Sequence, residues 1–227
     1  MVEIGRKNRE RRTDIADILQ RRLDTHDRNL QLLLVNALSK LGSVDVEKLA
    51  PLLTSPSREI RRTVVLAMGN SRDQAMLDHV EPLLRDPRWQ VRAAAAEAIG
   101  KVDAPRAAQA LTSLLDDEDP FVIKVALSGL RGQDTKPTPQ QLRQLIADHA
   151  EVADAAIDML VRSAGPAAVL SIYDQLPDRH SQIIVALSNI RYFNDRPGHA
   201  KAWAELLGKI AATTQTVEDR RRFAHLL

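Results

Sequence analysis

Apolar side chains recur along the chain at the spacing of amphipathic helices, and the arrangement returns about every 31 residues. The clearest copy is residues 83–100, LLRDPRWQVRAAAAEAIG. Two columns of apolar or small residues show the register: Ile60, Val91 and Val122 in one, and Ala67, Ala98 and Gly129 in the other. A fixed period of this length, without strand-like alternation, predicts stacked hairpins that each contain a first helix, a turn and a second helix.

Helical stripes continue on both sides of the clearest repeats, which lie in residues 45–132. They are found in residues 13–23, 28–41, 138–190, 199–212 and 216–227. We therefore expect an all-α fold, a right-handed α-solenoid of about seven stacked hairpins. It forms a single domain over residues 13–227 with an irregular last unit at 191–227. Residues 1–12 are expected to form a polar lead-in, either a solvated arm, the polar start of the first helix, or a contact for nucleic acid or an acidic partner.

The turns carry helix-start and helix-end signals. A capping side chain precedes a proline suited to the first helical position in three turns: Ser55-Pro56, Asp86-Pro87 and Asp119-Pro120. Gly69 and Gly100 are expected to end their second helices in a left-handed conformation. The longer connector at residues 133–139, QDTKPTP, is expected to be extended and is a candidate hinge.

The second helices are apolar on more than their core face. Counting the Val91-type residue as position 0, with about 100° per residue, positions 0, 3, 4, 7 and 8 form the core face. Position 5 lies beyond this arc, yet it is apolar in six helices: Val35, Val65, Ala96, Leu127, Ile157 and Leu187. Such a column predicts a flank buried against the next repeat. The alternative is an exposed groove for a partner helix.

Positions 1, 2 and 6 are expected to face outward, into a groove lined by the second helices. They supply the candidate partner-binding residues Arg61, Arg62, Arg92, Glu97, Lys124, Asp154 and Asp158. The order runs from basic to acidic, which favours a protein partner of complementary charge over the continuous basic stripe that nucleic acid requires. For Arg92 an alternative remains open: an ion pair with Asp86 or Asp117 in a ladder between repeats.

Aromatic residues are few, 3% of the chain, so each one is informative. Trp89 lies in a turn column, where it is expected to pack between neighbouring turns. Tyr192 and Trp203 fall in the irregular stretch at residues 190–203. They are further candidates for partner binding, with closure of the end of the stack as the alternative.

Composition narrows the classes of function. The 32 Lys and Arg residues nearly balance the 30 Asp and Glu residues, so charge alone does not indicate nucleic-acid binding. Cysteine is absent from the sequence, and no apolar run approaches the roughly 18 residues of a membrane span. The basic first residues lead into no apolar signal segment. We expect a cytoplasmic protein.

The sequence offers no convincing catalytic constellation. The acidic run at residues 116–119 lacks the alternating ligands of a calcium loop and suits helix capping instead. The six histidines are scattered, and no phosphate loop, nucleophile elbow or zinc-protease motif is found. We therefore expect no enzymatic activity, no cofactor and no metal.

The best copy resembles a known repeat. Its motif comprises Leu83, Leu84, Asp86, Val91, Arg92, Ala94, Ala95, Ala98, Ile99 and Gly100. This motif is similar to the HEAT-like repeat also found in phycobilin lyases, and Pro51 and Pro82 fit the bent first helix of HEAT repeats. The resemblance implies an α-solenoid, an architecture that serves many roles.

The leading interpretation is a non-enzymatic scaffold that binds a protein partner along the groove. The first alternative is a nucleic-acid-binding protein similar to the HEAT-like alkylpurine DNA glycosylases, suggested by Trp89 and Trp203. The second alternative is a phycobilin lyase or phycobilisome-associated accessory protein, suggested by the repeat subtype.

Overall fold

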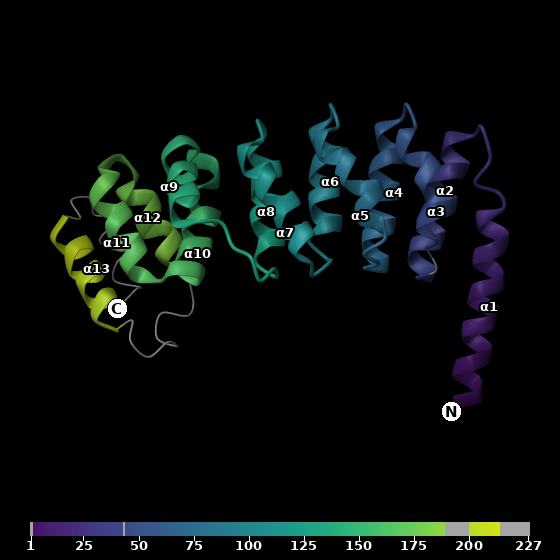
Figure 1. The fold of residues 1–227 in the computed structure, drawn as a ribbon, viewed down its shortest axis with the longest axis horizontal. Coiled ribbons are helices and arrows are strands. Elements are labelled where there is room, and N and C mark those ends of the chain that lie inside the picture. The colour runs from purple at the N-terminus through teal and green to yellow at the C-terminus, as the bar shows by residue number, and fades with distance from the viewer. Residues whose placement is uncertain (1, 43, 189–199, 214–227) are drawn as a thin grey trace. The chain divides into compact units, whose positions relative to one another are not determined.

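The protein is helical throughout the part that the structure describes. This computed structural model describes residues 2–42, 44–188 and 200–213, with side chains for residues 11–42, 44–187 and 201–213. These residues form thirteen α-helices and five 3₁₀ segments and contain no strand (Figure 1). The helices pack in sequence-adjacent pairs, which confirms the predicted all-α solenoid architecture. The chain forms two compact units, Met1–Thr135 and Lys136–Leu227, and each is described by itself.

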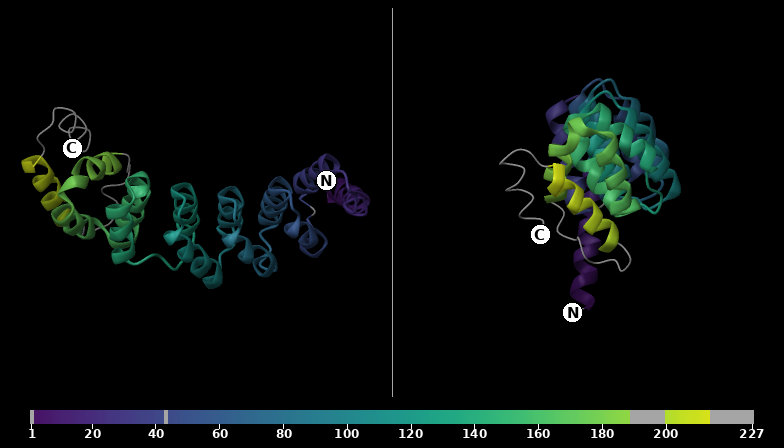
Figure 2. Two further views of the ribbon diagram at one scale, coloured as in Figure 1. Left: turned by 90° about the horizontal axis from the view of Figure 1, so that it is seen from above. Right: turned by 90° about the vertical axis from the view of Figure 1, so that its left-hand side faces the viewer.

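Unit 1 consists of helical hairpins. Its first helices are α1 (Val2–Gln20), α3 (Val46–Leu49) with η1 (Ala50–Thr54), α5 (Met76–Val80) with η2 (Glu81–Arg85), and α7 (Pro105–Ser113) with η3 (Leu114–Asp116). Its second helices are α2 (Arg28–Leu41), α4 (Arg58–Ser71), α6 (Trp89–Ile99) and α8 (Pro120–Leu130). Contacts join α2 to α4, α4 to α6, and α6 to α8, so the second helices form one row and the first helices another (Figure 2).

Two of the first helices change from α-helical to 3₁₀ geometry at a proline. Pro51 lies at the start of η1 and Pro82 at the start of η2, where an α-helical turn gives way to 3₁₀ geometry. Proline removes a backbone donor and crowds the preceding turn, which accounts for the change. α1 begins at Val2 and therefore includes most of the predicted polar lead-in.

Unit 2 continues the helical pattern. Its elements are α9 (Pro139–Asp148), η4 (Ala150–Val152), α10 (Ala153–Ala164), α11 (Pro166–Gln175), η5 (Pro177–Arg179), α12 (His180–Ser188) and α13 (Ala200–Thr213). α10 contacts α9, α11 and α12, and α11 contacts α13. The predicted helix at 216–227 lies outside the described residues. A single continuous solenoid over residues 13–227 remains a prediction.

The predicted caps are correct in one turn and wrong in two. Asp119 caps α8 through the N–H of Phe121, with Pro120 at the first helical position, as expected. α4 instead begins two residues after Pro56, and Ser57 caps it by accepting from the N–H of Ile60. α6 likewise begins at Trp89, and Asp86 accepts from the N–H of Arg88 at 2.9 Å. After Pro56 and Pro87 one further residue, Ser57 or Arg88, keeps an extended backbone, so both helices begin two residues after the proline.

The predicted left-handed glycines serve a different purpose. Gly69 lies inside α4, and Gly100 has a φ of −63°, so neither is left-handed. A Cβ on Gly69 would lie 2.6 Å from the Cβ of Ala98, and one on Gly100 would lie 2.8 Å from the Cα of Gly129. These glycines are needed where neighbouring second helices approach closely. The left-handed residue that ends α4 is Arg72, with a φ of 56°.

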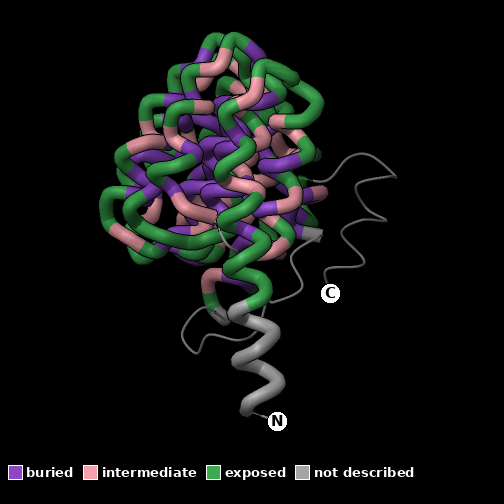
Figure 3. Tube along the Cα trace, turned by 90° about the vertical axis from the view of Figure 1, so that its right-hand side faces the viewer, coloured by how far each residue is buried: buried purple, intermediate pink, exposed green. Residues whose placement is uncertain are grey.

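The predicted stacking flank is buried. All six side chains of the position 5 column are at most 1% exposed: Val35, Val65, Ala96, Leu127, Ile157 and Leu187. This burial rules out the alternative in which the column is an open groove. In α2, where Val35 is position 5, Leu33 occupies position 3 of the expected core face, yet it is 67% exposed, so the expectation is wrong there. Elsewhere, the buried residues lie on the inner sides of the helices and the exposed residues on their outer sides (Figure 3).

Candidate binding groove

Two adjoining hollows lie on the side of unit 1 formed by the second helices. The first has a volume of about 290 Å³ and is lined by Arg62, Trp89, Gln90, Ala93, Ala94, Glu97, Phe121 and Val125. The second has a volume of about 420 Å³ and is lined by Leu32, Asn36, Arg58, Glu59, Arg62, Thr63 and Gln90. Arg62 and Gln90 line both hollows, so we treat the two together as the second-helix groove.

The helical period explains which residues reach the groove. With about 100° per residue, positions 2, 6 and −1 lie within about 60° of one another, opposite the core face. Arg62 occupies position 2, Glu97 position 6 and Gln90 position −1, and all three line the groove. The expectation that Arg62 and Glu97 face outward is therefore correct, since both are exposed.

Arg61 and Arg92, also expected to face outward, do not. Arg92 is 7% exposed, and the side chain of Arg61 is 12% exposed. Both occupy position 1, which lies about 40° from position 5 and therefore on the flank that meets the next repeat. The placement of these two arginines in the groove was wrong, because that flank is buried by stacking.

The two arginines instead form a ladder between repeats, the alternative considered for Arg92. Arg61 binds both carboxylate oxygens of Asp86, through Nε at 2.7 Å and Nη2 at 2.9 Å. Arg92 binds Asp117 in the same way, at 2.8 Å and 2.9 Å. Such paired hydrogen bonds to a carboxylate raise the pKa of both guanidinium groups. In α8 the equivalent position holds the buried Ile123.

Each ladder arginine also binds the turn of its own repeat. Nη1 of Arg61 donates to the carbonyl oxygen of Ser55 at 2.8 Å, and Nη1 of Arg92 donates to that of Asp86 at 3.0 Å. The ladder therefore ties the turn at Ser55 to the turn at Asp86, and the turn at Asp86 to the turn at Asp117. We infer that it stabilises the stack and does not contact partners.

Most charges in the groove are already paired. Arg58 Nε lies 2.8 Å from Glu59 Oε1, and Lys101 Nζ lies 3.1 Å from Glu97 Oε1. Hydrogen bonds from Arg58, the backbone and Ser57 lower the pKa of Glu59 to about 2, so it stays ionised near neutral pH. Arg62 differs, because it makes no ion pair or hydrogen bond within the described part of the chain. Among the described residues that line the groove, Arg62 is therefore the charged side chain without a partner of opposite charge.

An aromatic pair forms one wall of the first hollow. The rings of Trp89 and Phe121 meet edge to face, with centroids 5.4 Å apart. This contact confirms that Trp89 packs between neighbouring turns, yet Trp89 is 39% exposed and Phe121 54% exposed. Sequence reasoning did not select Phe121 for the groove. Its position −1, which lies on the outward arc, is the signal that could have found it.

Comparison with known proteins supports the repeat assignment. Residues 46–131 match the family model of HEAT repeats. We call this matched stretch, residues 46–131, the HEAT-repeat segment. A solved crystal structure of an engineered protein is 20% identical, with a TM-score of 0.43, and the match covers 93% of this chain and 94% of that chain. No curated protein matches the sequence.

The HEAT-repeat segment contains α3 to α8 and with them most of the second-helix groove. The groove-lining residues of α4, α6 and α8 all lie within it, including Arg62, Trp89 and Phe121. Lys124 of α8 also lies in the segment and is half-buried. No helix among the described residues has the length and apolarity needed to cross a membrane.

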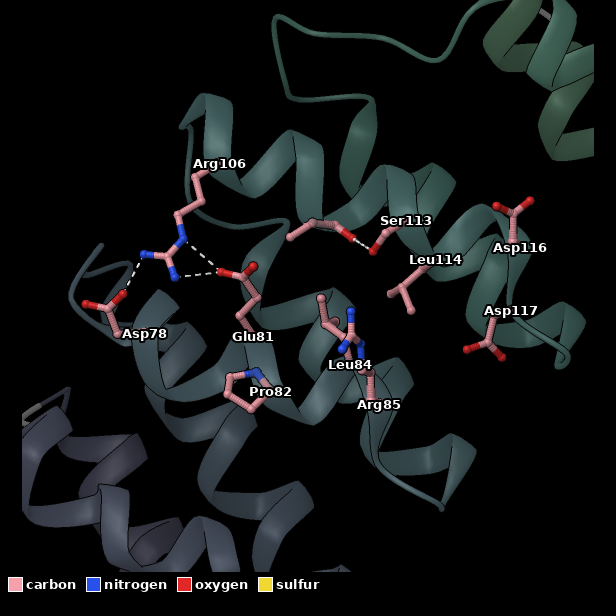
Figure 4. A pocket seen from close by; sticks show the side chains of 11 residues that line it. Asp78, Glu81, Pro82, Leu84, Arg85, Arg106, Ser113, Leu114, Asp116 and Asp117 are labelled. Atoms are coloured by element: carbon pink, nitrogen blue, oxygen red, sulfur yellow. Dashed lines mark hydrogen bonds and ion pairs between the residues drawn. The ribbon is translucent and has the colours of Figure 1, made fainter.

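A larger hollow, of about 620 Å³, lies on the first-helix side of the HEAT-repeat segment (Figure 4). Arg106 reaches across it and binds both Asp78 and Glu81. Asp117, at its edge, is held by Arg92. The acidic run at residues 116–119 thus serves the ladder and the α8 cap. The described residues contain no group of three or more metal-ligating side chains.

The remaining candidate residues lie in unit 2. Asp154 and Asp158 are both on α10, where Asp154 is exposed and Asp158 accepts from Arg162 Nε at 2.9 Å. Trp203 is only 6% exposed, so its selection as a partner contact was wrong: it packs into the interior of unit 2. Tyr192 lies outside the described residues.

Proposed function

We propose that unit 1 is a non-enzymatic interaction module that holds a segment of a protein partner in the second-helix groove. HEAT repeats commonly act as scaffolds for protein interactions, and stacked repeats create extended surfaces suited to that role. The observation that carries the proposal is Arg62, an exposed guanidinium that has no partner among the described residues and lines two adjoining hollows. Asp154 and Asp158 remain candidate partner contacts on unit 2.

The charge pattern of the groove favours protein over nucleic acid. A nucleic-acid backbone is bound by many unpaired cations, whereas here Arg58 is offset by Glu59, and Glu97 adds an acid. Trp203, one of the two tryptophans that suggested a similarity to DNA glycosylases, is buried in unit 2. The phycobilin-lyase alternative rests on the repeat subtype alone. A DNA-binding titration that shows tight, steeply salt-dependent binding would contradict our proposal.

Site-specific photo-crosslinking tests the proposal directly. A photoreactive phenylalanine analogue replaces Asn36, an exposed residue that lines the second hollow. The matched control carries the same analogue at Arg85, which is exposed on the first-helix side. We expect a discrete protein adduct in native-host lysate from the Asn36 variant alone, competed away by excess unmodified protein. Equal adducts from both positions, or none from Asn36, would contradict groove binding.

A further inference from the structure

We propose that the second-helix groove is selective for a peptide segment that carries a large apolar side chain beside an acidic residue. The apolar side chain enters the hollow bounded by Trp89 and Phe121, and the carboxylate binds Arg62. This inference rests on the proposed function and specifies the chemistry of the partner.

The first hollow exists because α6 carries alanine where its neighbours carry larger residues. At position 2, α4 has Arg62 and α8 has Lys124, but α6 has Ala93; at position 3 the corresponding residues are Thr63, Val125 and Ala94. The two alanines line the hollow and are themselves buried. The gap is therefore flanked by larger side chains on both sides, and its size of about 290 Å³ suits one large side chain.

The walls of this hollow favour an apolar occupant. Trp89 and Phe121 line the hollow together with the two alanines and Val125, and both aromatic residues are exposed. Covering this surface removes apolar area from water, which is the main favourable contribution in such contacts. Exposed aromatic residues that flank a hollow are also typical of the anchor sites of protein interfaces.

Arg62 selects the charge that accompanies the apolar side chain. Glu59 and Glu97, the acids of the groove, each have a basic partner close by in the sequence, Arg58 and Lys101. Arg62 lines the same hollow as Trp89 and has no such partner within the described residues. An arginine binds a carboxylate through paired hydrogen bonds, so an acidic residue next to the apolar anchor fits, and a basic one is repelled.

The extent of the groove indicates a peptide rather than a small molecule. It runs from Leu32 on α2 to Phe121 on α8, which is three helix-to-helix steps of about 8–10 Å each. A span of about 25–30 Å corresponds to about 8 extended residues or about 18 helical ones. A segment of this length can place an anchor in the first hollow and still contact the second.

The test is a selection from a displayed library of random 18-residue peptides on the full chain. We expect enriched peptides to carry an aromatic or aliphatic residue within four positions of an acid. Replacing that acid with lysine should weaken binding measured by fluorescence anisotropy about tenfold, in line with a charged hydrogen bond. The same selection on Arg62→Glu should enrich basic peptides instead. Arg85→Glu, on the other side of unit 1, should leave the acidic preference unchanged.

The outcomes separate this inference from the proposed function. A reversal of charge preference by Arg62→Glu, with loss of the anchor preference in Trp89→Ala, supports the inference, because a merely unfolded variant would not reverse preference. Failure to enrich peptides, or enrichment of peptides indifferent to both substitutions, overturns it. The inference is also overturned if sedimentation shows a dimer that Arg62→Glu dissociates, because the occupant of the groove would then be a second copy of the chain. In each of these cases crosslinking at Asn36 still decides the proposed function.

Discussion

Arg61 and Arg62 are neighbours on α4, yet they have opposite environments. Arg61 is held between two repeats by Asp86 and by the Ser55 carbonyl oxygen. Arg62 is exposed in the groove and lines both of its hollows. One residue changes the direction of a helical side chain by about 100°, which here separates the flank of the stack from its open side. Adjacent basic residues in such a repeat therefore serve stability in one case and recognition in the other.

The largest expected effect is on the buried member of the pair. Arg61→Met should lower the free energy of unfolding by about 3 kcal/mol, because it leaves the buried carboxylate of Asp86 without its partner. Urea unfolding followed by circular dichroism measures the loss. The matched control, Arg62→Met, should stay within about 0.5 kcal/mol of the unmodified protein. Equal losses at the two positions would break the comparison.

The next largest loss of stability is expected where two second helices, α6 and α8, approach each other closely. Gly100→Ala places a methyl group against the backbone of Gly129 and should cost about 1–2 kcal/mol. Gly208→Ala in α13 is the control, since a Cβ there meets nothing within 4 Å and the helix gains propensity. We expect the control to be neutral or stabilising in thermal unfolding. A stabilising Gly100→Ala would show that α6 and α8 are not in close contact.

The turn before α4 decides where the helix starts and hence which way each arginine points. Ser57→Ala should destabilise by about 1 kcal/mol, because the N–H of Ile60 loses its acceptor. Ser55→Ala removes a single contact, to the N–H of Ser57, whereas Ser57→Ala also removes the hydrogen bond to Glu59, so the Ser55 substitution should cost less. If chemical denaturation shows a larger loss of stability for Ser55→Ala than for Ser57→Ala, then Ser55 is the N-cap of α4, as the sequence predicted, and the helix does not begin at Arg58.

The smallest effect concerns the exposed ion pair beside Arg62. The pKa of Glu59 is lowered to about 2, mainly by Arg58, so its ionised form is favoured in the folded state. Any stabilisation is complete above the ordinary pKa of 4.5 and is lost as the pH falls toward about 2. Carboxyl chemical shifts in an NMR titration should show this low midpoint, and Arg58→Ala should return it toward 4.5. A midpoint near 4.5 in the unmodified protein would mean that the pair does not form in solution.

The sequence by itself determined the fold class and much of the packing. The 31-residue period and the helical stripes predicted stacked hairpins, and the apolar position 5 column predicted the buried flank, Ala96 and Leu127 included. These predictions succeed because apolar burial is periodic along a helix and can be read without knowing its neighbours. The acidic turn residues also made the Arg92 ladder foreseeable as an alternative.

Only the tertiary structure decided how the helix faces are used. Periodicity shows that Arg61 and Arg62 point in different directions, but it does not show which direction the next repeat occupies. The same reason explains Gly100, whose role depends on the approach of Gly129, and the groove, whose wall joins Trp89 to Phe121 across two helices. The local pattern of a helix specifies its own faces, whereas the partner of each face is set by the packing of repeats that lie about 31 residues apart.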